Sequence, residues 1–406
     1  MNVVKLLSCA LVAALGCVWV PAAPAAQSQE PHAAHETAER LRHAPRTFPI
    51  KKFYDTANLA AGKPGDLIRS QEFDQYDLPE GVLATRILYH SRSASGQDVP
   101  VSGVVLYPDR KPPAQGWPII AWAHALDGVA RQCAPSLRKN VQHGPFLTMY
   151  VKLGYAVVAT DYAGLGTAVR NSYADAQSNA TDVIYSVPAA RAAVHGLDAR
   201  WVAVGIGEGG PSVVAVAESE ADVQDPNYLG SLAISGLDDP LNRYRSSTPT
   251  ISYDSPPFLA FGIKTDYPEF ELKDLLTEQG MGLYPQVEQS CGDPVVESKR
   301  SPSEMLKPNW ADNKFAKLFF SRSTLGEHPA KRPLMIITSE LDSATPIQTT
   351  EQVIARMCKQ GDRVQFERLA ESDPGSVFGD SVRDQISWIE SRFAGRQAES
   401  NCSGRH

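Results

Sequence analysis

Short hydrophobic runs alternate with helix-forming segments along most of this chain. Buried strands are predicted at residues 117–123, 155–160, 201–204, 229–236, 333–338 and 363–369, each an apolar run of strand length bounded by turn residues. Helices are predicted between and after them, at residues 145–153, 182–194, 211–218, 348–358 and 382–393. Strands and helices that alternate at this spacing form a parallel sheet with helices on both faces. We therefore expect an α/β fold.

Two further runs, residues 84–89 and 99–107, depart from this pattern because only a short segment joins them. A connection of that length suits an antiparallel hairpin. After the strand at 229–236 the alternation stops, and residues 237–330 are rich in Pro, Ser, Tyr and acidic side chains. That stretch is too long for a structureless loop. We predict a cap or lid subdomain there, inserted between two parts of the core at 47–236 and 331–406.

The first 26 residues have the pattern of a secretory signal peptide. Lys5 precedes an apolar core, Leu6–Val20, and Ala23-Pro24-Ala25 supplies the small residues of a cleavage site. The apolar core is too short and too close to that site for a good membrane span, so no transmembrane segment is expected. We expect a secreted or periplasmic protein, with an imperfect lipobox at Ala14–Cys17 leaving a lipid-anchored form as the alternative. Residues 27–46 are polar and without periodicity, which predicts a mobile leader.

Charge and cysteine content narrow the picture further. The formal net charge of −7 gives no obvious attraction to nucleic acid or anionic membranes, and no nucleic-acid partner is expected. Beyond the signal peptide four cysteines remain, an even number that an oxidising compartment pairs. Of three possible pairings we favour Cys358–Cys402, tying the tail to the last helices, and Cys133–Cys291, tying the insertion to the core. No CxxC or Cys/His cluster indicates a metal, and no cofactor is expected.

A glycine-rich turn at residues 205–210 is the stretch around which the chain is organised. The apolar run Trp201–Val204 climbs into Gly205-Ile206-Gly207-Glu208-Gly209-Gly210, and an Ala/Val-rich helix leaves it. This is the shape of a nucleophile elbow, the strand-to-helix turn on which α/β-hydrolases expose a serine. Gly207 stands where that serine is expected, and a glycine has no side chain with which to attack a carbonyl.

Several motifs together resemble the secretory lipase family of α/β-hydrolases, the lipase A type, over nearly all of the mature chain. Besides the elbow these are, in order, Pro64-Gly65-Asp66-Leu67-Ile68-Arg69, Ala123-His124-Ala125-Leu126-Asp127-Gly128, Thr160-Asp161-Tyr162-Ala163-Gly164-Leu165-Gly166-Thr167, Glu340-Leu341-Asp342-Ser343-Ala344-Thr345-Pro346 and Asp373-Pro374-Gly375-Ser376. The resemblance implies an α/β-hydrolase fold with a cap. It also implies hydrolysis of acyl esters by a Ser-Asp-His triad.

The departures from the family pattern concern the chemistry. The family elbow reads Gly-His-Ser-Gln-Gly-Gly, and the resemblance places Gly207 at the serine and Glu208 at the glutamine. Asp342 aligns with the triad aspartate, whereas Pro374 takes the place of the triad histidine. The oxyanion stretch, where the family has His-Gly and small hydroxyl residues, here reads His124-Ala125-Leu126, followed by the expected Asp127. Acyl transfer needs a nucleophile and a base within hydrogen-bond reach, so we expect no efficient hydrolysis.

Other interpretations of the same residues stay open. Gly205, Gly207 and Gly210 match a dinucleotide fingerprint, although not in a first βαβ unit. Glu208 is a candidate carboxylate nucleophile or base, and with Asp127, Asp342 and Asp373 it would form an acidic pocket that receives a cation or an amine. The bland alternative is that Asp342 orients a local loop and Glu208 faces solvent or a backbone amide.

The remaining candidates are histidines and one tyrosine. His195 and His328 are expected on the surface or in loops, and the only histidine after Asp342 is the terminal His406. His124 and Tyr162 follow strand ends, where α/β folds place their sites, so ligand contact and turn-holding hydrogen bonds are both open for them. The favoured function is a degenerate ester hydrolase that holds an apolar, acyl-like ligand or a protein partner. The alternative is an active lipase or esterase that uses other residues.

Overall fold

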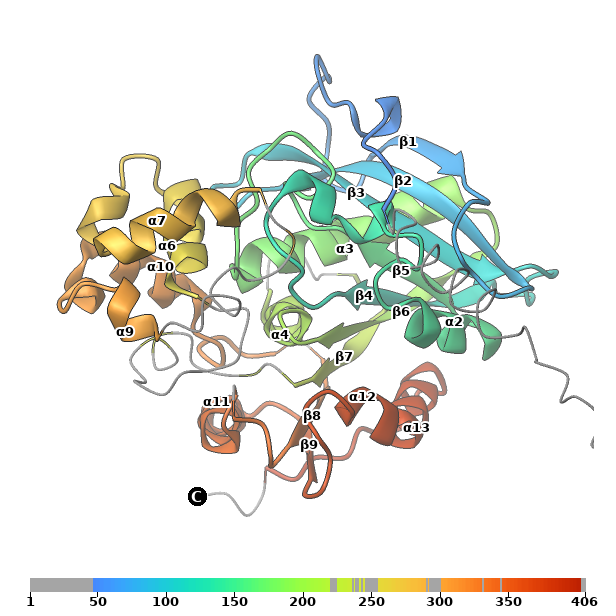
Figure 1. Ribbon diagram of the computed structural model, residues 1–406. Helices are drawn as coiled ribbons and strands as arrows, with labels where there is room; N and C mark the ends of the chain where they lie inside the picture. Colours follow the sequence, from blue (N-terminus) through green and yellow to red (C-terminus); the bar gives the residue numbers. More distant parts are fainter. Residues whose placement is uncertain are drawn as a thin grey trace, which may run out of the picture. The chain divides into compact units, whose positions relative to one another are not determined.

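A sheet of nine strands runs through the described residues, in the order β1-β2-β3-β5-β4-β6-β7-β8-β9 (Figure 1). The computed structural model describes residues 47–219, 225–235, 237, 241, 244, 255–289, 291, 301–330, 332–343 and 345–402. The chain divides into Met1–Pro45 and Arg46–His406, and every described residue belongs to the second unit. The expected signal peptide and leader lie outside the described residues.

The sheet is parallel from β4 to β9 and antiparallel at its first edge. Neighbours among β4 to β9 pair in parallel, whereas β1 pairs with β2, β2 with β3 and β3 with β5 in antiparallel register. The mostly parallel sheet confirms the expected α/β class. The strands are β1 (Leu67–Glu72), β2 (Val82–Arg92), β3 (Asp98–Pro108), β4 (Trp117–Ala123), β5 (Ala156–Thr160), β6 (Leu197–Ile206), β7 (Tyr228–Ile234), β8 (Leu334–Ser339) and β9 (Val364–Leu369).

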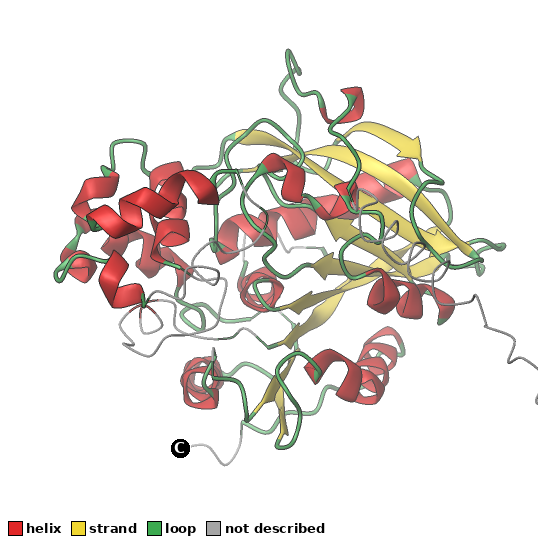
Figure 2. Ribbon diagram, viewed as in Figure 1, coloured by secondary structure: helices red, strands yellow, loops and turns green. Residues whose placement is uncertain are grey.

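Helices cover both faces of the sheet (Figure 2). Because side chains alternate along a strand, Ile119 and Ala121 of β4 pack with α3, α4 and α11, while Ile120 and Trp122 pack with α2, α12 and α13. The α-helices of the core are α2 (Gly144–Lys152), α3 (Ala176–Ala193), α4 (Gly209–Glu218), α11 (Ile347–Gln360), α12 (Val377–Asp380) and α13 (Val382–Phe393). Short 3₁₀ helices lie at η1 (Lys52–Tyr54), η2 (Arg131–Cys133), η3 (Pro135–Leu137), η4 (Leu272–Asp274) and η5 (Trp310–Asp312).

Two elements differ from the sequence prediction for physical reasons. The helix expected at 182–194 begins at Ala176, because the carboxylate of Asp175 accepts hydrogen bonds from Gln177 N and Ser178 N, both 3.1 Å away, and caps it. Strand β1 was not predicted at all. It carries only two apolar residues and is an edge strand with a largely exposed second half, so neither alternation nor a buried run marks it.

The segment between β7 and β8 holds helices of its own. They are α6 (Pro256–Asp266), α7 (Glu278–Val287), α9 (Pro302–Met305) and α10 (Lys314–Ser323), gathered at one end of the sheet (Figure 1). Their apolar side chains form a separate cluster that includes Phe258, Phe270 and Phe319 and takes in Tyr173 from the segment before α3. The inserted helices therefore have their own hydrophobic core, to which Tyr173 of the main α/β part also contributes.

Two disulfides join distant parts of the chain, Cys133–Cys291 and Cys358–Cys402, which is the pairing favoured from the sequence. The first connects η2 to Cys291, four residues after α7 ends, and the second connects α11 to the C-terminal tail. No helix among the described residues is long and apolar enough to cross a membrane.

Candidate functional site

The turn between β6 and α4 has the backbone of a nucleophile elbow. Gly207 adopts a left-handed φ of +57° between the last residue of β6 and Glu208. Its amide donates to Ile234 O at 3.1 Å on β7, and its carbonyl accepts from Gly210 N at 2.9 Å. The sharp, left-handed corner that exposes a nucleophile is thus present, with a glycine at its apex.

The glycines around this corner are required for different physical reasons. A Cβ on Gly205 would lie 2.0 Å from Gly209 O, and one on Gly209 would lie 2.0 Å from Ala123 O, so strand and helix backbones leave no room there. A Cβ on Gly207 would meet the Ala125 side chain at 3.1 Å, a much milder contact. Glycine is therefore favoured at Gly207 by the positive φ, whereas close packing of the backbones requires glycine at Gly205 and Gly209.

The residue opposite the apex belongs to the stretch aligned with the oxyanion region. Ala125 O lies 2.7 Å from His124 Nδ1, and His124 Nε2 lies 3.2 Å from Asp161 O. The imidazole is buried and stacks on Tyr162 with 4.2 Å between ring centroids. Burial lowers the pKa of His124 to about 4, so at neutral pH it is an uncharged structural group. These contacts hold the imidazole against Ala125, Asp161 and Tyr162.

The next two residues of that stretch are held by different neighbours. Leu126 packs against the apolar cluster of the inserted helices. Asp127 forms an ion pair with Arg138, and although burial raises the pKa of its carboxyl, the guanidinium opposes that shift. The Asp127 carboxylate is therefore paired with a cation, next in sequence to the residue that contacts the inserted helices.

Buried carboxylates fix the loop after β5, where Tyr162 lies. Asp161 accepts from Ser102 Oγ at 2.6 Å and Ser136 N at 2.7 Å, and burial raises its pKa to about 6. Asp182 on α3 accepts from Ala163 N at 2.7 Å, and burial raises its pKa to about 7. Between these anchors Tyr162 keeps a φ of +65° and donates its hydroxyl to His124 O at 3.2 Å. The buried Tyr162 side chain therefore holds the turn through this hydrogen bond, although the left-handed backbone at Tyr162 is unfavourable.

Glu208 points toward the start of α3. Its Oε1 accepts from Ala174 N at 3.1 Å and from Asn179 Nδ2 at 3.3 Å. The carboxylate thus faces a backbone amide, as the bland interpretation expected. In the part of the chain that the structure describes, no group of three or more such side chains could hold a metal ion. An acidic pocket of Glu208, Asp127, Asp342 and Asp373 for an amine stays a prediction.

The positions aligned with the triad acid and base lie in the loops after β8 and β9. Asp342 is 8% exposed and accepts from Thr345 N at 2.9 Å, which orients the loop that leads into α11. Pro374 is exposed, and around it Ser376 N donates to Asp373 O at 2.8 Å. Pro374 is the second residue of this four-residue turn, where its fixed φ favours the turn conformation.

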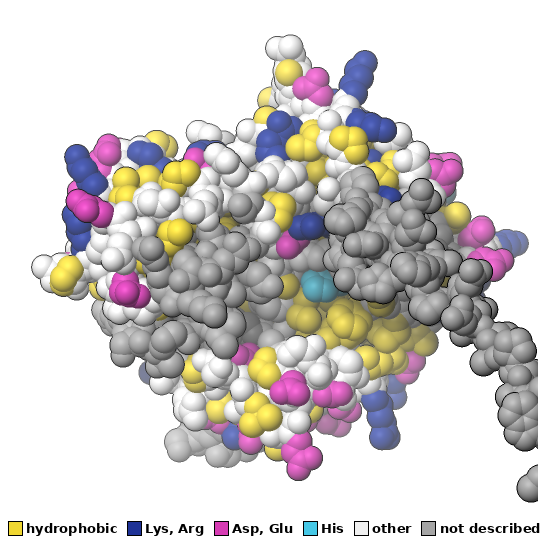
Figure 3. Space-filling view, viewed as in Figure 1, with side chains coloured by type: hydrophobic (Ala, Val, Ile, Leu, Met, Phe, Trp, Pro, Cys, Tyr) yellow, Lys and Arg dark blue, Asp and Glu magenta, His cyan; other side chains and the backbone are white. Residues whose placement is uncertain are grey.

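A corner before α2 was missed in the sequence. Val141 and Gln142 both have positive φ, +49° and +57°, although neither is a glycine. The corner places Gln142 Nε2 3.1 Å from Ala125 O and His143 beside Trp122, with 5.9 Å between ring centroids. Only the Gly144-Pro145 pair marks a turn here, so no sequence signal identified His143. In the space-filling view, hydrophobic side chains gather in a recessed area between α2 and α12, with a histidine at its edge (Figure 3).

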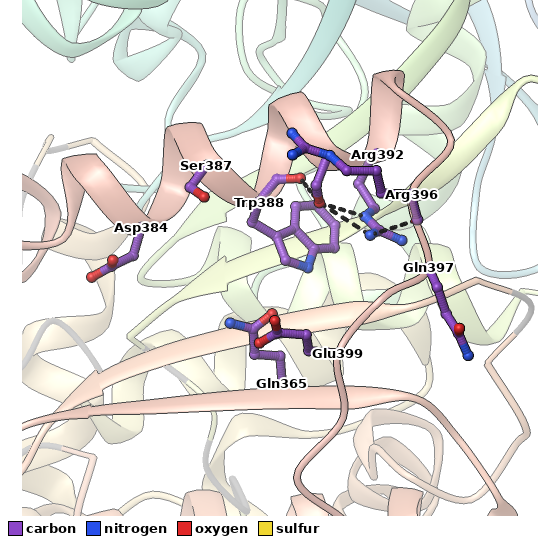
Figure 4. Close-up of a pocket in the computed structure, with 9 residues that line it drawn as sticks. Gln365, Asp384, Ser387, Trp388, Arg392, Arg396, Gln397 and Glu399 are labelled. Carbon is purple, nitrogen blue, oxygen red and sulfur yellow. Dashed lines mark hydrogen bonds between the residues drawn. The ribbon is translucent and has the colours of Figure 1, made fainter.

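Two surface cavities lie elsewhere. One of about 220 Å³ is open between β9, α13 and the C-terminal tail, where Trp388, Arg392 and Glu399 contribute to its wall (Figure 4). The other, of about 550 Å³, is lined by residues of the β1–β2 connection, including Phe73, Tyr76 and Leu78, and by neighbouring strand residues. Neither of these two cavities includes a residue of the elbow or of the loops aligned with the triad.

The fold is the α/β-hydrolase fold, and the turn between β6 and α4 has the geometry of its elbow. The structure superimposes on Candida antarctica lipase A in its closed state with a TM-score of 0.69 and 15% sequence identity, over 87% of this chain and 88% of the other. It also superimposes on the rice cell wall degrading esterase LipA from Xanthomonas oryzae, with a TM-score of 0.67 and 17% identity over 83% of this chain and 100% of the other.

One relative is similar at the level of sequence. The chain is 20% identical over 377 residues to a Mycobacterium tuberculosis protein named "probable inactive lipase", covering 85% of this chain and 82% of the relative. No family model matches the chain. These similarities support the resemblance to lipases stated from the motifs.

Proposed function

We propose that this protein is an exported, catalytically inactive relative of the acyl-ester hydrolases that binds an apolar, acyl-like ligand between the inserted helices and the core. The elbow carries this proposal. Its backbone keeps the left-handed corner, yet its apex is Gly207, and the loop aligned with the triad base presents the exposed Pro374. Neither a nucleophile nor its base is supplied at these positions.

Three further observations support the proposal. The carboxylate of Glu208 is engaged by Ala174 N and Asn179 Nδ2, which speaks against the alternative of an active hydrolase that uses Glu208. Export is supported by the predicted signal peptide and by two disulfides, which persist in oxidising compartments. The name of the relative, "probable inactive lipase", agrees with the inactivity proposed here.

Ester hydrolysis and ligand binding test the two halves separately. We expect the wild-type protein to hydrolyse p-nitrophenyl butyrate and octanoate no faster than a buffer blank, and to bind the neutral apolar dye Nile red. Enzyme-like turnover that disappears in Glu208→Gln would contradict inactivity. Failure to bind Nile red would contradict the ligand and favour a protein-binding role for the same surface.

Substitutions that create hydrolytic activity would show which groups the inactive protein lacks. The double variant Gly207→Ser/Pro374→His restores both missing groups, but the new serine Cβ would lie 3.1 Å from the Ala125 side chain. We therefore expect the triple variant with Ala125→Gly to be the most active, at least about tenfold above the double variant, because it frees that space. The matched control is Gly207→Ala/Pro374→His/Ala125→Gly, which has the same backbone demands and no nucleophile.

A further inference from the structure

The larger of the two surface cavities lies beside the edge of the sheet, where residues 73–81 connect β1 to β2. Its volume of about 550 Å³ falls within the range of roughly 300–1,000 Å³ that is typical of small-molecule sites. None of the described residues that line it belongs to the elbow, to the loops aligned with the triad or to the inserted helices. A ligand in this cavity would therefore be separate from the one proposed above.

Two aromatic rings in the wall of the cavity are held in place by their neighbours. Phe73 and Tyr76 pack edge to face, with 4.7 Å between ring centroids. The guanidinium of the buried Arg86 lies 3.3 Å from the centroid of Phe73, and its Nε donates to Tyr76 Oη at 2.8 Å. Tyr76 Oη donates in turn to Ser136 O at 2.7 Å. This part of the wall is therefore fixed before a ligand arrives.

Aliphatic side chains complete the wall and leave apolar surface uncovered. Leu78 and Val82 are half-buried, and Leu83 is 40% exposed although it belongs to strand β2. A ligand that covers these side chains removes their apolar area from water, which contributes favourable free energy to binding. The cavity therefore favours a ligand with an apolar body.

A single sign of charge accompanies this apolar wall. Glu72, Asp74 and Glu80 contribute exposed carboxylates, whereas no lysine, arginine or histidine of the described chain lines the cavity. None of the three carboxylates forms an ion pair or a hydrogen bond with another described side chain. Arg86, which supports the rings, interacts electrostatically with the buried carboxylate of Asp161. A cleft lined by one sign of charge concentrates ligands of the opposite sign.

The apolar wall and the carboxylates together select a class of ligand. A neutral hydrocarbon would leave the carboxylates without a partner, and an anion would be repelled by them. A bare metal ion is not favoured, because no group of three or more acidic, histidine or cysteine side chains within the described ranges could hold one. An amine with an apolar body uses both features, since its ammonium group pairs with carboxylates while its body covers the wall.

We propose that the cavity beside the β1–β2 connection binds a small organic cation, an amine that carries its charge at one end of an aromatic or aliphatic body. The body lies against Phe73, Tyr76 and Leu83, and the ammonium group faces the three carboxylates. This inference goes beyond the proposed function, because it assigns a second site that does not involve the inserted helices.

The test compares three probes of similar shape by calorimetry at pH 7 and low salt, using the full mature chain. They are 4-phenylbutylamine, which is a cation, the neutral 4-phenylbutan-1-ol and the anion 4-phenylbutyrate. The amine is expected to bind at least about fivefold more tightly than the alcohol and to lose this advantage at high salt, because salt screens exposed charges. The anion is expected to bind most weakly.

A cation placed in the wall locates the site. Leu83→Lys is expected to weaken binding of the amine about tenfold or more, through repulsion and lost apolar contact. Leu153→Lys, at a leucine that is 51% exposed and does not line the cavity, is the matched control and should bind the amine as the wild type does. Both variants should bind Nile red as the wild type does, which separates this cavity from the ligand site proposed above.

Removal of the three charges tests the carboxylates. The variant is Glu72→Gln/Asp74→Asn/Glu80→Gln. Its control removes three exposed carboxylates elsewhere, in Asp384→Asn/Glu390→Gln/Glu399→Gln. We expect the first to bind the amine and the alcohol equally and the second to keep the wild-type preference. Equal affinities of the wild type for amine and alcohol, or tighter binding of the anion, would overturn the cationic ligand class. Amine binding that survives Leu83→Lys, or binding of none of the probes, would overturn the site.

Discussion

The elbow and the loop after β9, the two regions aligned with the triad serine and histidine, differ in how far they keep the geometry that a catalytic residue requires. At the elbow the backbone still has the left-handed corner, and Gly205 and Gly209 still permit the contact of β6, α4 and β4. The apex itself is a glycine and has no side chain. In the loop after β9, Pro374 lies exposed in a tight turn, where a buried, oriented base would have to be held by neighbours.

This difference shows that the packing of the fold and the chemistry of catalysis place separate requirements on the same motif. The elbow joins a central strand to a buried helix, so its geometry is required by the packing of the sheet whatever the protein does. The loop of Pro374 lies at the surface, where a change of residue costs little. A motif that survives in a chain without its catalytic side chain is therefore a sign of the fold.

The largest expected effect separates the two kinds of glycine in the elbow. In Gly209→Ala the new Cβ would lie 2.0 Å from Ala123 O, so we expect a loss of at least about 3 kcal/mol in the free energy of unfolding. Gly207→Ala should cost about 1–2 kcal/mol, the penalty of a left-handed conformation. Urea unfolding followed by circular dichroism measures both. Equal losses would mean that the apex is as tightly packed as the helix contact, contrary to the 3.1 Å that a Cβ on Gly207 would keep from Ala125.

A smaller effect concerns the buried carboxylate that holds the loop beside the elbow. Burial raises the pKa of Asp182 to about 7 in the folded protein, above its value in the unfolded chain. The folded state then binds the proton more tightly, so the stabilising contribution is full below about pH 4 and is lost as the pH rises through about 7. The slope is at most about 1.4 kcal/mol per pH unit for one group.

Stability measured by urea unfolding between pH 5 and pH 8 checks this expectation. Asp182→Asn removes the titrating group, so its stability should fall less over that range than that of the wild type. The matched control is Asp373→Asn, an exposed carboxyl in the loop of Pro374, which should follow the wild-type curve. Parallel curves for Asp182→Asn and wild type would show that Asp182 does not titrate in this range.

The sequence predicted the fold through features that act locally. Apolar runs such as Ile119–Ala123 become buried strands because every second side chain meets helices on one face and the rest meet helices on the other. The elbow was recognisable because glycines are required at fixed positions by close backbones. Edge strand β1 was not recognised because the sequence of an edge strand needs neither alternation nor continuous hydrophobicity.

The site was predictable only where a motif named it. The aligned positions Gly207, Asp342 and Pro374 were found by their place in motifs. In contrast, the surroundings of His143 arise from an unusual backbone at Val141 and Gln142 and from rings contributed by β4 and α2. Positive φ at residues other than glycine has no sequence signal, and contacts between distant segments follow from the tertiary fold. Sequence reasoning therefore named the positions aligned with the triad and missed His143.

The smallest expected effect lies at Pro374. Because the proline presets φ in an exposed turn, Pro374→Ala should lower the free energy of unfolding by only about 0.4–1 kcal/mol, mainly by giving the unfolded chain more freedom. Pro374→His should cost a similar amount, since the loop after β9 has no close packing around this side chain to lose. Urea unfolding of both variants beside the wild type measures the difference. A loss as large as that of Gly209→Ala would mean that the loop is as constrained as the elbow, and the contrast between the two regions would disappear.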